Sequence, residues 1–331
     1  MLNIMLITVV ILALGFDFIN GFHDTANSIA TSVSTRVLSP RQAIVMAAVL
    51  NFWGALVSHK VAKTISSGLV QGSLEQYVII AALLAAIIWD LITWYYGIPS
   101  SSSHALIGGL IGAAIAYASG FSTIIWKGVW EKVLIPLITS PIAGFLLGYL
   151  FMSILFAALR PFSQRFVNGW FSKLQILSAA WMSFSHGNND AQKSMGIITL
   201  AMVSAGMLPK GSDVPWEVML ACAVAMGLGT SIGGWKIIKT MGVNMIRLQP
   251  INGFAAETGA AIVIQAASAI GAPVSTTHVI SSAIMGVGAS KRLSAVRWAL
   301  ARNIVWAWVL TIPVTALIGA IITALIKLAI S

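Results

Sequence analysis

Long apolar stretches recur along the whole sequence, and their length limits what the chain can fold into. Clear examples occupy residues 78–96, 133–159, 218–232 with their flanks, and 304–330. A helix needs about 20 apolar residues to cross the roughly 30 Å hydrocarbon core of a bilayer. Backbone groups in lipid must be hydrogen-bonded internally, and these runs are too long for barrel strands. We therefore expect an all-α polytopic membrane protein with roughly 10–12 membrane segments.

The composition agrees with a multi-pass protein of the cell (inner or plasma) membrane. Only 8% of the 331 residues are charged, against about 25% in soluble domains. The net charge of +10 comes from basic residues in short polar connections, which is typical of topology-setting and lipid-headgroup contacts and predicts no nucleic-acid partner. The first segment lacks a basic start and a cleavage site, so we expect it to be retained. The lone Cys222 permits no internal disulfide and is expected to be buried.

Two motifs occur twice, once in each half of the chain. GIPSSSSH (97–104) matches GAPVSTTH (271–278), and NGFHDTANS (20–28) matches HGNNDAQKS (186–194). The second pair aligns Asp24 with Asp190. We therefore expect two inverted-topology repeats, residues 1–159 and 174–331, joined by a short basic connection at 160–173.

The apolar segments that follow the motifs are short. Residues 25–33 and 279–287 cannot span a bilayer alone, which predicts broken or re-entrant helices that meet near mid-membrane. Paired interruptions of this kind are the best sequence indication of a transporter's binding site. Irregular backbone at that depth must be buried in protein or line a wet cavity.

The acidic motif places carboxylates where a membrane helix should be apolar. One such group costs at least about 2.5 kcal/mol, so it is a functional candidate by default. On a helix that begins near residue 24, Asp24, Asn27, Ser28 and Thr31 share one face. With carbonyls freed by a helix break, they would form an oxygen site for Na⁺. The alternative is that Asp24 and Asp190 are only helix N-caps. The predicted sodium ligands are Asp24, Asn27, Ser28, Asn189, Asp190, Ser194 and Glu257.

Three other carboxylates fall in predicted membrane segments without a partner in the other half. Glu257, beside Thr258, is a candidate third ion site or gating group. Asp17 and Asp90 have either a functional role or a structural one, by pairing with another polar helix.

In the hydroxyl motif, a proline ends one helix and a Ser or Thr caps the next. A helix start with free N–H groups and hydroxyls binds anions, and two facing copies would enclose a tetrahedral oxyanion. Gln192 and Lys193 are additional donors. The alternative is ordinary capping and helix packing. The predicted anion ligands are Ser101, Ser102, Ser103, His104, Ser275, Thr276, Thr277, His278, Gln192 and Lys193.

Two of the five histidines occupy matching positions in the two halves of the chain, and the others do not. His104 and His278 do, and they are candidate anion donors, proton carriers or structural groups. His23 and His186 have no repeat partner and are assigned supporting roles, while His59 is expected at the surface.

With both motifs in both halves, nearly the whole chain resembles the inorganic phosphate transporter (PiT) family. The resemblance implies a phosphate importer coupled to Na⁺ or H⁺, without enzymatic activity or other cofactor, that forms a homodimer. His23-Asp24 with Asn27, and Asn189-Asp190, fall on the family's acidic signatures. Residues 101–104 and 275–278 fall on its substrate motifs. The first acidic motif reads HDTAN where ND-x-AN is usual, and the hydrophilic domain of animal relatives is missing, as in compact prokaryotic members.

These observations favour cation-coupled phosphate symport by alternating access. A bound cation would offset the anion's charge at low dielectric, and the oxygen-rich acidic sites favour Na⁺ over H⁺. The alternatives are a permease for sulfate or another tetrahedral oxyanion and an uncoupled anion channel. A Ser/His hydrolase is disfavoured because the serines recur in both halves without a nucleophile elbow.

Overall fold

The computed structural model describes residues 4–71 and 74–330, and this part of the chain is α-helical apart from its connections and one isolated bridge between Val70 and Ile124. The first half contains α1 (Ile4–Ser34), α2 (Pro40–Ala55), α3 (Lys60–Gly68), α4 (Gln76–Tyr96), α5 (Ser102–Ala118), α6 (Trp126–Val129), the π-helix η1 (Trp130–Leu134) and α7 (Ile135–Ala158). The second contains α8 (Gln164–Ser204), α9 (Trp216–Ile232), α10 (Trp235–Lys239), the π-helix η2 (Thr240–Asn244), α11 (Pro250–Ala269), α12 (Thr276–Lys291), the 3₁₀-helix η3 (Leu293–Ala295) and α13 (Trp298–Ile330).

Several of these helices are long and apolar enough to cross a membrane. Within the described residues four qualify alone: α1, α4, α13 and the continuous stretch Trp126–Ala158. Two further pairs qualify only together, α2 with α3 and α9 with α10–η2, and they bend by 64° and 63°. The predicted all-α membrane fold with broken helices is therefore confirmed, and each bent pair follows one of the helices that carry an acidic motif.

The predicted helix break at the acidic motifs is wrong. Helix α1 runs without interruption through Asp24, and α8 runs 41 residues through Asp190. Both carboxylates therefore lie in helix interiors, so they are not N-caps and no broken backbone frees carbonyls beside them. The connection expected at 160–173 is also shorter, because Ser163 caps α8 and the helix begins at Gln164.

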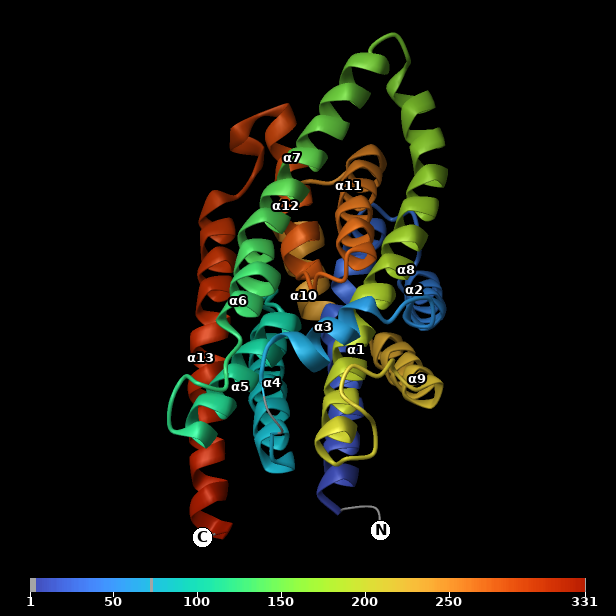
Figure 1. Ribbon diagram of the computed structural model, residues 1–331. Coiled ribbons are helices and arrows are strands. Elements are labelled where there is room, and N and C mark those ends of the chain that lie inside the picture. Colours follow the sequence, from blue (N-terminus) through green and yellow to red (C-terminus); the bar gives the residue numbers. More distant parts are fainter. Residues whose placement is uncertain (1–3, 72–73, 331) are drawn as a thin grey trace.

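The two halves of the chain pack into each other (Figure 1). Helices α7 and α8 form a long hairpin whose turn lies at the end of the molecule opposite both termini. Helix α1 packs against α8 and α9, α5 against α13, and α7 against α12. Helices α1, α5 and α7 thus pack against partners from the other half.

Two apolar clusters lie above and below a polar layer. Helix α1 contributes Leu6 to Phe16 to one cluster and Ala26 to Ala30 to the other. Helix α8 does the same in reverse, with Phe171 and Met182 in the second cluster and residues 191–201 in the first. The polar residues between these stretches, 17–25 on α1 and 183–190 on α8, are therefore buried between the two cores.

Candidate functional site

The two acidic motifs meet inside this polar layer. One ligand atom from each of Asp24, His186 and Asp190 lies within 4.8 Å of the other two. All three residues are buried, with Asp24 the most accessible at 3%. The structure thus brings together the two carboxylates that the repeat had paired, and it adds a histidine that the sequence had assigned a supporting role.

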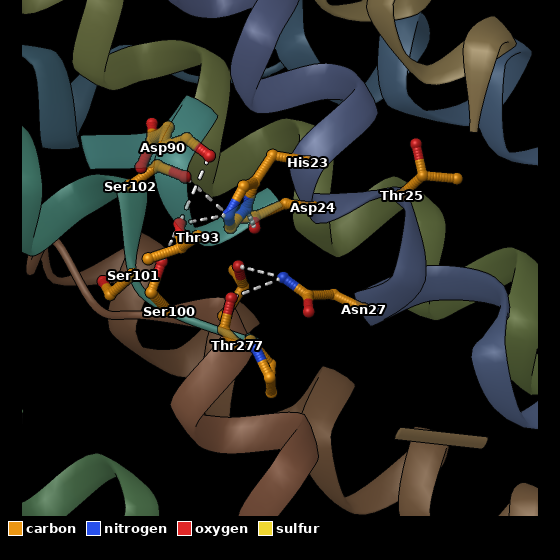
Figure 2. A network of polar contacts seen from close by, with 12 residues as sticks. His23, Asp24, Thr25, Asn27, Asp90, Thr93, Ser100, Ser101, Ser102 and Thr277 are labelled. Carbon is orange, nitrogen blue, oxygen red and sulfur yellow. Dashed lines mark hydrogen bonds and ion pairs between the residues drawn. The ribbon is translucent and has the colours of Figure 1, made fainter. Parts of the chain in front are cut away.

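Asp24 is held by neighbours from its own half of the chain (Figure 2). The Nδ1 atom of His23 lies 2.6 Å from Asp24 Oδ1, and Ser102 donates to Asp24 Oδ2 at 3.3 Å. The other ring nitrogen of His23 lies 3.0 Å from Thr93 Oγ1, to which Ser100 donates at 2.8 Å. The first acidic motif is therefore linked on both sides to the residues that begin α5.

Asp190 is paired with a lysine of its own helix. Lys193, one helical turn later on α8, donates to Asp190 Oδ1 at 2.6 Å, and both side chains are fully buried. Thr276 donates to Asp190 Oδ2 at 3.1 Å, and His186 Nε2 lies 3.5 Å from the same oxygen. Lys193, predicted as an anion ligand, is thus engaged with a carboxylate.

Hydrogen bonds also cross between the halves. Asn27 on α1 donates to Thr276 at 3.2 Å and to Thr277 at 2.9 Å, both at the start of α12. Thr276 therefore accepts from Asn27 and donates to Asp190. This connects an acidic motif of each half to one hydroxyl group.

The predicted capping of the hydroxyl motifs is confirmed. Ser101 has extended backbone and accepts from the backbone N–H of His104 at 3.2 Å. Ser275 repeats this with His278, also at 3.2 Å. The two helix starts therefore have the same geometry, and all residues of 100–104 and 275–278 are at most 2% exposed.

The two motif histidines face each other. Their rings have centroids 4.9 Å apart, and His278 stacks on Trp308 of α13 at 4.0 Å. Trp308 also donates from its indole N–H to the carbonyl of Pro99 at 3.1 Å, so it contacts both hydroxyl motifs. Sequence reasoning missed Trp308, because it lies outside the repeats in an apolar helix and no local pattern marks it.

Gln192, predicted as an anion donor, is used elsewhere. Its side-chain oxygen accepts from the backbone N–H groups of Val61 and Ala62 at 2.8 and 3.3 Å, so it caps the start of α3. Asn189, a predicted cation ligand, donates to Ser268 at 2.8 Å. The hydroxyls of Ser28 and Ser194, also predicted ligands, are buried and make no hydrogen bond to any residue that the structure describes.

Glu257 lies in a cage of its own. One carboxylate oxygen accepts from Thr31 and from Gln175, the latter at 3.3 Å, and the other accepts from Ser178. Thr31 comes from α1, the two others from α8, and Glu257 from α11. Thr31 was predicted to share the face of Asp24, but its hydroxyl bonds to this second carboxylate instead.

The remaining predictions on single residues have simple outcomes. Both carboxylate oxygens of Asp17 and of Asp90 are buried without a hydrogen bond in the described chain. Cys222 is buried as expected, and His59 lies partly exposed beside Asp213. Three polar partners around Glu257 and His23 come from residues that carry no sequence signal: Gln175, Ser178 and Thr93.

Comparison with known proteins shows which family the chain resembles. Residues 20–319 match the Phosphate transporter family. The chain is 54% identical to the probable low-affinity inorganic phosphate transporter of Bacillus subtilis (strain 168), over 97% of this chain and 96% of that protein. It is 50% identical to the protein of the same description in Rhizobium meliloti (strain 1021), over 96% and 95% of the two chains.

A solved structure extends the match to three dimensions. "The sodium-dependent phosphate transporter" superposes with a TM-score of 0.88 at 28% identity, covering 98% of this chain and all of the other. These relatives are transporters rather than enzymes, and the long apolar helices agree with a multi-pass plasma-membrane protein. The chain belongs to the phosphate transporter family.

Proposed function

We propose that the chain imports inorganic phosphate by cation-coupled symport, with Na⁺ rather than H⁺ as the coupling ion. The observation that carries the proposal is the meeting of Asp24 and Asp190 within 4.8 Å, next to two capped helix starts. The predicted inverted repeats and a homodimeric assembly belong to the same proposal. The relatives' names support phosphate, and one of them supports sodium.

Charge compensation provides the coupling. Two carboxylates so close in a buried site repel each other. Lys193, which pairs with Asp190, can offset only one of the two negative charges. A bound Na⁺ at Asp24 and Asp190, with oxygens from Asn27 and Thr276, would cancel the remaining charge. Phosphate, which is itself costly to bury, then enters a site whose carboxylate charge is already neutralised.

The hydroxyl motifs provide the anion site. The N-terminal turns of α5 and α12 carry free backbone N–H groups and the positive ends of their dipoles. Ser103 and Thr277 add hydroxyls beside them. Ser102 and Thr276, at the same helix starts, donate to Asp24 and Asp190, which supports adjacent anion and cation sites in which each ion raises the affinity of the other.

The burial of the site favours a gated transporter over an open channel. The carboxylates and hydroxyls that would bind ions are at most 3% exposed. Ions reach them only if helices move, and the bent pairs α2–α3 and α9–α10 are natural hinges for such movement.

Proton coupling is the second candidate, and one contact favours it. His23 Nδ1 lies 2.6 Å from Asp24, in a site that also holds His186. A histidine beside a carboxylate is a ready proton carrier. In this account Lys193 replaces Na⁺ as the counter-charge of Asp190.

Uptake of labelled phosphate into proteoliposomes separates these accounts. An inward Na⁺ gradient at equal pH should drive accumulation, and a proton gradient without Na⁺ should not. The reverse result would establish proton coupling. Strong competition by sulfate would indicate a broader oxyanion permease, and equilibration without either gradient would indicate a channel.

A further inference from the structure

A second polar cavity lies far from the ion site, at the other end of α12. It has a volume of about 590 Å³ and is lined by the η2–α11 connection, the end of α12 and η3. Helix α12 begins with the hydroxyl motif and ends at Lys291, so the helix joins the two regions. Figure 1 shows the α12–α13 connection at the same end of the molecule as the α7–α8 turn.

The cavity carries a concentrated positive charge without any acidic neighbour. Its lining includes Arg247, Lys291, Arg292 and Arg297, and no Asp or Glu. All four side chains are exposed, and none forms an ion pair or a side-chain hydrogen bond within the described parts of the chain. By contrast, the lysine-lined pocket beside α3 includes Glu131, and its Lys63 pairs with Asp213.

The lining of the cavity contains apolar as well as basic side chains. Phe156 at the end of α7, Ile246 and Val287 line it together with the basic residues. The N-terminus of α11, a helix of 20 residues, also opens here and adds the positive end of its dipole. This arrangement fits a phosphodiester head with apolar chains attached.

The location suits a lipid. Trp298, the first residue of α13, is 47% exposed beside the cavity, as is typical of a residue at the membrane interface. The α7–α8, η2–α11 and α12–α13 connections carry Arg or Lys but no acidic residue, whereas the α8–α9 connection mixes Lys210 with Asp213. By the positive-inside rule the cavity then faces the cytoplasmic leaflet.

We propose that this cavity, lined by Arg247, Lys291, Arg292 and Arg297, binds the headgroup of an anionic phospholipid. The basic residues bind the phosphate, and the apolar residues contact the upper acyl chain. The occupied site would join the α12–α13 connection to the η2–α11 connection, which already share the hydrogen bond from the Arg297 N–H to the Met245 carbonyl.

Binding of short-chain phosphatidylglycerol to the purified full chain in neutral detergent tests the proposal. The variant Arg247→Gln/Arg292→Gln/Arg297→Gln should bind it roughly 100-fold more weakly, since each basic residue near an anionic lipid contributes about fivefold. The matched control, Lys127→Gln/Lys210→Gln/Lys327→Gln, removes three exposed charges elsewhere and should bind like the wild type. Phosphatidylcholine and millimolar inorganic phosphate should not compete.

Equal binding by the wild type and the arginine variant would overturn the proposal. Full competition by inorganic phosphate would also overturn it, because the cavity would then hold a free anion. If the triple variant does not fold, the single variant Arg292→Gln replaces it in the test. Its affinity for phosphatidylglycerol should be about fivefold lower than that of the wild type, and an unchanged affinity would overturn the proposal. None of these readouts depends on transport.

Discussion

Thr276 is the residue through which the two halves of the site are connected, since its hydroxyl accepts from Asn27 and donates to Asp190. A hydrogen bond to a charged group contributes about 1.5–3 kcal/mol. Replacement by valine keeps the shape of the side chain but removes both bonds, so the cation and anion sites lose their common partner.

We expect Thr276→Val to raise the phosphate KM by roughly tenfold or more, the effect of about 1.4 kcal/mol. The control is Thr323→Val in α13, because that hydroxyl is buried and has no hydrogen-bond partner in the described chain. Uptake kinetics of both variants check this. An unchanged KM in Thr276→Val would show that the hydroxyl does not take part in binding.

Glu257 has different surroundings, because three neutral donors hydrogen-bond to it and no basic residue of the described chain forms an ion pair with it. A glutamine there accepts fewer hydrogen bonds and attracts no cation. We expect Glu257→Gln to raise the Na⁺ concentration for half-maximal uptake severalfold, while the rate at saturating Na⁺ is largely kept. The Na⁺ dependence of phosphate uptake measures this, and an unchanged dependence would make Glu257 a structural group.

The sequence identified most of the residues that meet in the buried polar layer, but not their bonding. The repeat identified Asp24, Asp190 and the capping serines, because helix starts and intramembrane charges leave local signals. It failed on Gln192, whose partners at the start of α3 are 131 and 130 residues away in the chain. Such tertiary pairings have no signature in a single sequence.

At the scale of elements, the hydroxyl motifs depend on the helices packed behind them. Trp308 of α13 stacks on His278 and donates to the Pro99 carbonyl, so one side chain fixes both helix starts. Phenylalanine would keep the stacking and lose the hydrogen bond, which contributes about 1 kcal/mol.

We expect Trp308→Phe to raise the phosphate KM about fivefold with little change in the amount of folded protein. Trp306→Phe is the matched control on the same helix, since Trp306 is 59% exposed. Measurement of KM and maximal rate for both variants tests the role. Equal kinetics in the two would contradict it.

The contact between α5 and α13 is close enough to require glycine. A Cβ atom at Gly112 would lie 1.9 Å from the Ala316 carbonyl oxygen. Gly112→Ala should therefore destabilise the protein by at least about 1–3 kcal/mol, as expected for overpacking. Gly169→Ala in α8 meets nothing within 4 Å and should stabilise its helix by roughly 0.5–1 kcal/mol. Thermal unfolding in detergent compares them, and equal stability would contradict the packing described.

The predictions of helices succeeded where the length of an apolar run indicates a membrane helix, and they failed at the acidic motifs. Helices α1 and α8 are not bent at these motifs. The bends lie at the α2–α3 and α9–α10 junctions, which follow α1 and α8 in the chain. In a sequence, polar residues within an apolar run look like the end of a helix. Here the polar layer is instead buried between two apolar cores, which lets α1 and α8 continue through it.

At the scale of the whole molecule, the interlocking of the two halves makes the proposed ion site a shared one. Its hydrogen-bonded side chains come from α1 and α5 in the first half and from α8 and α12 in the second. Movement of one half against the other would open the site on one side and change both ion sites together. This supports coupling between the cation and phosphate rather than independent binding.

The most direct test of the central claim is phosphate uptake by the Asp24→Asn variant in proteoliposomes under an inward Na⁺ gradient. Asp24 is preferable to Asp190, whose replacement would leave Lys193 buried without its counter-charge and destabilise the fold by about 3–5 kcal/mol. We expect the wild type to accumulate phosphate and the folded variant to lose gradient-driven uptake. Normal Na⁺-driven uptake by Asp24→Asn would contradict the account.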